Sequence, residues 1–197
     1  MIGLRSRKQI RVRGGVLALA LALLAVPTGA ASAKVFASQQ QALAEAFPEA
    51  SRIQRRTLLI RKKDAEKITA ITHNELESKL VVIHTAYKED ELLGYAHIDV
   101  HNVRTKPEAF MIVLKPDGTV RSVRILAFHE PLDYLPTSRW YDQFAGKTRE
   151  DALRVGHDVH GVVGATLSAR AAADGVRRML AYWEVLLKSP EVETQAP

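Results

Sequence analysis

The sequence predicts an α+β domain in which an antiparallel β-sheet of about four strands packs against helices, with a long C-terminal helix. Three observations lead to this class. Between Leu80 and Phe128 apolar and polar residues alternate with the period of β-strands. Short charged or Pro-Asp-Gly turns divide this region into pieces of strand length. From Val176 onward, apolar residues recur every three or four positions, which is the period of an amphipathic helix.

The alternating region is expected to form four strands, at residues 80–87, 92–103, 109–114 and 119–128. The first turn is Lys88-Glu89-Asp90-Glu91, and the last is Lys115-Pro116-Asp117-Gly118. Strands with such short connections form an antiparallel meander. Helices must then cover its apolar face.

The segments around these strands are expected to be mostly helical. Ser38, followed three residues later by Gln41, fits a capping box at the start of a short helix. Asp64 could cap a second helix, and Thr137 or Ser138 a third that ends at Gly146. The basic segment 51–63 fits either an exposed strand or an exposed helix face, and the pattern leaves both open.

Residues 1–33 have the pattern of a signal peptide. Basic residues precede a short apolar run, and Ala31-Ser32-Ala33 fits the cleavage site. The run is too short to span a bilayer, which favours cleavage over the alternative of a retained membrane anchor. The domain is then expected at 34–187, followed by a disordered polar tail at 188–197.

Charge and cysteine content exclude several classes of function. The chain has 28 Lys and Arg against 22 Asp and Glu, but the excess lies almost entirely within residues 1–33. A nucleic-acid partner is therefore not expected, because it requires a concentrated basic face. With no cysteine in the chain, disulfides, cysteine-ligated iron–sulfur clusters and c-type haem attachment are excluded. An exported electron carrier of this composition would most easily use a flavin.

The most informative stretch runs from His157 to Arg170 and leads into the closing helix. Gly164 and Ala165 leave little side-chain bulk before Thr166, so a large group could reach its hydroxyl. The first turn of a helix offers free N–H groups and a positive dipole end, which favour a phosphate. A tight loop with an ordinary helix start is the competing interpretation.

Gly164-Ala165-Thr166-Leu167-Ser168 resembles the signature of the FMN-binding domain family, found in the C subunit of the sodium-pumping NADH:quinone reductase and the G subunit of Rnf complexes. The resemblance implies FMN bound through a phosphoester on Thr166, attached outside the cytoplasm by a flavin transferase. It also implies that the five motif residues are cofactor-binding. His160 and Val163 stand where the family usually has Asp and Ser.

Two further segments extend the resemblance. Trp140-Tyr141-Asp142-Gln143-Phe144-Ala145-Gly146-Lys147 is similar to an aromatic-Gln-Phe-x-Gly-Lys run of the family. Glu130 corresponds to a glutamate in a turn near the flavin, although Pro131 replaces the usual threonine. A carboxylate there could either hydrogen-bond to the flavin ring or only anchor the loop.

The resemblance implies an exported, periplasmic electron carrier whose partners are the flavin transferase and redox proteins of the membrane or periplasm. A flavin-dependent reductase of a small acceptor is an alternative. A second alternative is a metal-binding module without flavin, because His97, Asp99 and His101 alternate along one predicted strand and include good ligands for transition metals. A solvated polar strand face is the simpler explanation of that alternation.

Overall fold

Residues 34–188 are described in the computed structural model, and they contain one six-stranded antiparallel sheet. The expected signal peptide and the expected tail beyond Lys188 lie outside the described residues. The strands are β1 (Lys34–Val35), β2 (Arg52–Leu59), β3 (Leu80–Lys88), β4 (Glu91–Asn102), β5 (Pro107–Leu114) and β6 (Val120–Phe128), and their order in the sheet is β1-β6-β5-β4-β3-β2. The meander β3–β6 confirms the four predicted strands, and β1 and β2 extend it at its two edges.

The prediction of about four strands was too low because both additional strands lie at edges. β2 is the basic segment for which strand and helix remained open, and its side chains are exposed or only half-buried. Its strand conformation comes from pairing with β3, where Arg52 lies opposite Tyr87 and Leu59 opposite Leu80. A strand whose conformation depends on pairing with a neighbouring strand shows only a weak apolar pattern in its own sequence.

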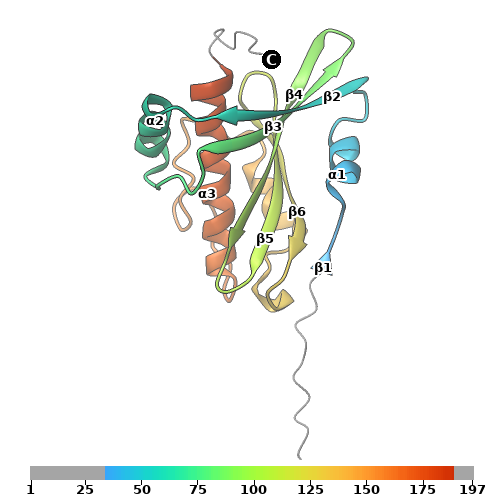
Figure 1. Cartoon of the computed structure of the whole chain (residues 1–197). Coiled ribbons are helices and arrows are strands. Elements are labelled where there is room, and N and C mark those ends of the chain that lie inside the picture. Colours follow the sequence, from blue (N-terminus) through green and yellow to red (C-terminus); the bar gives the residue numbers. More distant parts are fainter. Residues whose placement is uncertain (1–33, 189–197) are drawn as a thin grey trace, which may run out of the picture. The chain divides into compact units, whose positions relative to one another are not determined.

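Helices lie on both faces of the sheet (Figure 1). α1 (Gln39–Ala46) covers one face, and α2 (Lys62–Thr72) and α3 (Thr166–Tyr182) lie on the other. Two short 3₁₀ helices follow the last strand, η1 (Leu132–Tyr134) and η2 (Ser138–Phe144). A turn of π-helix, Trp183–Leu187, continues α3. Among these described helices, none combines the length and apolar character needed to cross a membrane.

The predicted helices are confirmed with shifted starts. The Ser38 hydroxyl accepts a hydrogen bond from Gln41 N at 3.2 Å, which is one half of the expected capping box; the Gln41 side chain binds Glu45 instead. α2 begins at Lys62 rather than after Asp64, and Arg61 is its N-cap residue. η2 follows Thr137 as expected, although it is 3₁₀ rather than α-helical.

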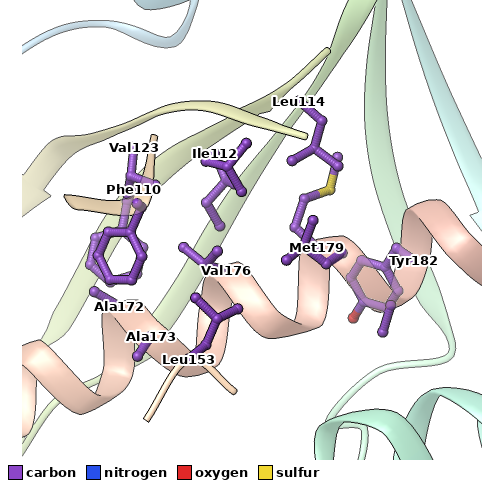
Figure 2. Close-up of a cluster of buried hydrophobic side chains, with 14 of the residues drawn as sticks. Phe110, Ile112, Leu114, Val123, Leu153, Ala172, Ala173, Val176, Met179 and Tyr182 are labelled. Atoms are coloured by element: carbon purple, nitrogen blue, oxygen red, sulfur yellow. The ribbon is translucent and has the colours of Figure 1, made fainter. Parts of the chain in front are cut away.

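Alternation along β5 divides the core into two layers. Phe110, Ile112 and Leu114 point toward α3, where they meet Val176 and Met179 (Figure 2). The intervening residues of β5 pack toward α1. Small residues on α3 let the helix approach the sheet closely: a Cβ added at Gly175 would lie 2.8 Å from Asp99 Oδ2.

β3 and β4 pair over only part of their length. Their ladder runs from Lys88 opposite Glu91 to His84 opposite Ala96. Beyond it the two strands separate, and His97 Nδ1 donates to Val82 O across the gap at 2.9 Å. A wedge-shaped pocket of about 250 Å³ lies here, which we call the wedge pocket; its lining includes Ser78, His97 and Asp99.

Candidate functional site

Thr166 is the first residue of α3, and its side chain is exposed. Gly164 has a φ of +84°, a left-handed conformation that suits glycine and turns the chain into the helix. Thr166 Oγ1 donates to Val162 O at 3.4 Å, which is a long and weak hydrogen bond. The first helical turn has N–H groups without partners inside the helix. The hydroxyl and these donors therefore lie at the same point of the surface.

A pocket of about 210 Å³ adjoins Thr166, and we call it the threonine pocket. It is formed by three segments that are distant in the sequence: the β4–β5 loop, the segment after β6 and the start of α3. Its lining residues are Val103, Arg104, Glu130, Tyr134, Gly164, Ala165, Thr166, Leu167 and Ser168. All six residues that the sequence suggested for cofactor binding lie in this lining.

Glu130 fixes the β4–β5 loop against the end of β6. Its Oε1 accepts hydrogen bonds from the N–H groups of Thr105 and Lys106, both at 2.9 Å, and from Thr105 Oγ1 at 3.2 Å. The bond from the Thr105 N–H is the main reason why the pKa of Glu130 lies below its ordinary value. The structure therefore supports the anchoring role for this carboxylate, and all of these contacts use one oxygen.

Ser168 is also in the lining, but its hydroxyl already has a partner. The side chain is fully buried, and Oγ donates to Tyr134 O at 2.7 Å. This bond ties the first turn of α3 to η1. Leu167, in contrast, is 45% exposed. The two residues after Thr166 therefore differ. Ser168 holds the pocket together, whereas Leu167 offers an apolar side chain at its mouth.

Sequence reasoning missed three residues of the lining: Val103, Arg104 and Tyr134. Arg104 and Tyr134 come from different segments, and the Arg104 guanidinium carbon lies 4.9 Å from the centre of the Tyr134 ring. Arg104 places a cation in the same pocket as Thr166, where a phosphate would need one. Arg170, the last residue of the stretch singled out in the sequence, is not in the lining. Only the folded position of the β4–β5 loop identifies Arg104.

The loop before Thr166 is held by η2. Gln143 Oε1 accepts from His160 N at 2.7 Å, and Trp140 Nε1 donates to His160 O at 2.8 Å. These bonds give a physical reason for the spacing of the aromatic-Gln-Phe run. The imidazole of His160 does not take part, because both bonds use the main chain of that residue. This side chain is exposed.

Asp158 stabilises the loop from its other end. Its carboxylate accepts from the N–H groups of Leu153 and Arg154 at 2.8 and 2.7 Å, and Lys147 Nζ lies 3.6 Å away. Burial acts to raise the pKa of Asp158, but these donors hold it below the ordinary value. Asp158 thus has a structural role and does not replace the acidic residue that the family usually has at position 160.

His97, Asp99 and His101 share one face of β4 as predicted, but that face is not solvated. All three are covered on the α3 side of the sheet, and Asp99 is only 4% exposed. Arg178 binds the Asp99 carboxylate directly, so a cation already neutralises it. Within residues 34–188, no group of three or more His, Asp or Glu side chains is arranged to hold a metal. The geometry therefore argues against the metal-binding alternative.

The threonine pocket has groups suited to holding a phosphate ester, and within residues 34–188 no basic side chain is hydrogen-bonded to the Thr166 hydroxyl. The only described partner of the Thr166 hydroxyl is a backbone carbonyl, and the oxygen of Glu130 that makes contacts is occupied by three donors. Efficient activation of a hydroxyl requires a base within hydrogen-bonding reach. The arrangement is suited to retaining an attached anion.

The family model described as FMN-binding domain matches residues 105–181. The match begins in the β4–β5 loop and ends near the end of α3, so it contains Glu130, η2 and the loop that precedes Thr166. Arg104 lies one residue before it. No curated protein matches the chain.

Proposed function

Because residues 105–181 form an FMN-binding domain whose cofactor is FMN, we propose that this protein is an exported electron carrier with FMN attached to Thr166 through a phosphoester. The observation that carries the proposal is the position of the Thr166 hydroxyl. It is exposed at the start of α3, in a pocket that also contains Arg104. A phosphate there would meet a guanidinium group and the positive end of the helix dipole.

The size of the threonine pocket favours a carrier over a reductase. At about 210 Å³, it is smaller than the roughly 300–1,000 Å³ of pockets that enclose a drug-sized ligand. A pocket of this size would enclose only part of an FMN, so a closed chamber for a second substrate is not expected there. Exposed Leu132, Val163 and Leu167 lie in the segments around its mouth and offer apolar surface to a ring or a partner.

Bound FMN supplies the one- and two-electron chemistry, and the chain supplies attachment and orientation. Arg104 neutralises the phosphate, Glu130 keeps the β4–β5 loop in place, and Gln143 holds the loop that leads to Thr166. A phosphoester also prevents loss of the cofactor by dilution outside the cytoplasm. Since no base among the described residues is hydrogen-bonded to the Thr166 hydroxyl, we expect a flavin transferase as the maturation partner.

The test is to export the chain from cells that contain a flavin transferase, denature it, and measure FMN by mass and fluorescence. One FMN per chain is expected, and Thr166→Ala should abolish the adduct without unfolding the protein. Ser168→Ala is the matched control: it removes a hydroxyl two residues away and should keep the adduct, at a cost in stability of about 1–2 kcal/mol. An adduct that persists in Thr166→Ala would refute the assignment.

His160→Asp tests the departure from the family pattern. The His160 side chain is exposed and its main chain makes the contacts with η2, so the substitution should not disturb the loop. We expect flavin attachment to improve or stay unchanged, measured as the rate of adduct formation. A loss of attachment would mean that the imidazole itself is required.

A further inference from the structure

Three buried polar groups meet under α3 without completing their hydrogen bonds. Glu108 is fully buried, and neither of its carboxyl oxygens has a partner of good geometry. The Tyr141 hydroxyl and His101 Nε2 are also buried, and neither has a partner of good geometry among residues 34–188, although the Tyr141 hydroxyl is close enough to Glu108 to interact with its carboxyl group. His101 Nε2 lies 4.0 Å from Glu108 Oε2. Buried polar groups are rarely left in this way, so the cluster requires an explanation.

The cluster and the threonine pocket are connected through short stretches of the chain. His101 on β4 lies opposite Glu108 on β5. The next pair, Asn102 and Pro107, is the last of this hairpin. The loop beyond that pair contributes Val103 and Arg104 to the pocket. Tyr141 is on η2, whose neighbouring residues hold the main chain of His160. His101 and Glu108 are thus on the strands joined by the β4–β5 loop, and Tyr141 is on the 3₁₀ helix that holds the loop before Thr166.

A row of polar groups runs from the cluster toward the wedge pocket. His101 Nδ1 donates to Asp99 Oδ2 at 2.9 Å, and His97 Nε2 lies 3.8 Å from Asp99 Oδ1. His97 and Asp99 both line the wedge pocket, which opens between β3 and β4. An imidazole can pass on a proton by using its two nitrogens in turn. His101 is placed to do this between Asp99 and Glu108.

Electrostatics decide which member of the row holds a proton. Burial raises the pKa of Glu108 to about 8; the Tyr141 hydroxyl opposes this shift, and the negative charge of Asp99 adds to it. Asp99 behaves in the opposite way: despite burial, His101, His97 and Arg178 hold its pKa well below the ordinary value. Phe128, opposite Glu108 on β6, has no titratable group. Glu108 is therefore the site of the proton.

We infer that Glu108, with His101 and Tyr141, is a proton-binding site that takes up a proton from solvent when FMN on the neighbouring pocket is reduced. The inference rests on the proposed function for the presence of FMN. The electrons come from the reductant and stay on the flavin. In the protein, the Glu108 carboxylate takes up one proton from solvent and becomes a carboxylic acid. Added negative charge nearby favours the neutral acid, so uptake is largest near pH 8 and above.

The first test needs no flavin. In the flavin-free chain, the infrared band of a protonated carboxyl should be present at pH 7 and disappear around pH 8, and Glu108→Gln should lack it. Glu150→Gln, which changes an exposed carboxylate in a nearby loop, is the matched control and should keep the band. Tyr141→Phe should move the titration to higher pH, because the hydroxyl that favours the charged form is lost.

The second test uses the flavinylated chain and dithionite as the reductant. At pH 8–9, reduction should increase the carboxyl band in the wild type and in Glu150→Gln, but not in Glu108→Gln. The midpoint potential should also fall more steeply with pH near 8 in the wild type than in Glu108→Gln. Proton uptake in Glu108→Gln equal to that of the wild type would overturn the inference, as would a wild type without the band at pH 7.

The two proposals can fail separately. A chain that stays colourless beside an active flavin transferase contradicts the proposed function and the coupling to FMN. The flavin-free titration would still decide whether Glu108 binds a proton. If FMN is attached to Thr166 but reduction leaves the carboxyl band unchanged at pH 8–9, only the coupling is wrong.

Discussion

Arg178 on α3 binds both carboxylate oxygens of Asp99 on β4, with Nη2 at 2.7 Å from Oδ1 and 2.8 Å from Oδ2. A third bond joins Nε to Oδ1 at 3.1 Å. This ion pair lies between the helix and the sheet, within the layer that is otherwise filled by apolar side chains. It fixes the position of α3, whose first residue is Thr166.

Asp99→Ala should therefore destabilise the domain strongly. The substitution leaves the Arg178 guanidinium largely buried without its counter-ion, for which we expect a loss of about 3 kcal/mol in the free energy of unfolding. Denaturant unfolding at neutral pH measures this change. Glu49→Ala removes the exposed partner of Lys88 and should change the free energy of unfolding far less, because an exposed ion pair is screened by solvent. Equal losses in the two variants would contradict the assigned role of the buried pair.

Glu108 should make the stability of the wild type depend on pH. Its folded pKa of about 8 lies above the ordinary value of 4.5, so the folded state binds more protons than the unfolded state between these limits. The contribution of the neutral acid is complete below about pH 4.5 and is lost as pH rises toward 8 and beyond. Unfolding curves between pH 5 and 9 should show this fall in the wild type and a flatter profile in Glu108→Gln. Parallel profiles would mean that Glu108 is ionised in the fold.

Arg104 should contribute to FMN affinity through the phosphate alone. On a Thr166→Ala background, where FMN can bind only noncovalently, Arg104→Gln should weaken FMN binding by roughly tenfold, the value of one charge-assisted hydrogen bond. Riboflavin, which has no phosphate, should bind equally well to both proteins. Flavin fluorescence titration measures the affinities, and Arg170→Gln is the matched control outside the pocket lining. A similar loss with riboflavin would place Arg104 beside the ring instead.

Gln143→Ala should loosen the loop before Thr166 while leaving the core intact. It removes the acceptor for His160 N, and also the bond from Gln143 Nε2 to Trp140 O at 2.8 Å. We expect faster hydrogen exchange in residues 157–165 and slower flavin attachment, with a stability loss of about 1–2 kcal/mol. Gln41→Ala, at an exposed position on α1, should leave all three quantities unchanged.

The central meander could be predicted from the sequence because its signals are local. Alternation along β3–β6 and the Pro-Asp-Gly turn gave four strands whose positions are confirmed, and the apolar period gave α3. β2 could not be assigned in the same way. Its apolar residues Ile53 and Leu58 are half-buried and pack against opposite layers of the core, so its conformation depends on pairing with β3.

The candidate site, too, could be predicted from the sequence only in part. Thr166, Gly164 and Ala165 could be found because they form a short contiguous motif, and Glu130 through the resemblance. Arg104 and Tyr134 belong to no motif, and they reach the threonine pocket only because the β4–β5 loop and η1 fold against the start of α3. The alternation of His97, Asp99 and His101 was correct, but the expected solvated face was wrong. Alternation shows which residues share a face and leaves open what covers it.

The sequence by itself determined the strand meander, the closing helix and the threonine at the start of that helix, because each depends on residues close together in the chain. Only the tertiary structure decided which side chains surround that threonine and which polar groups are buried beneath α3. The reason is physical: burial and ion pairing depend on distances between segments far apart in sequence. Thus Asp99 could be a metal ligand until Arg178, 79 residues further along the chain, was found bound to it.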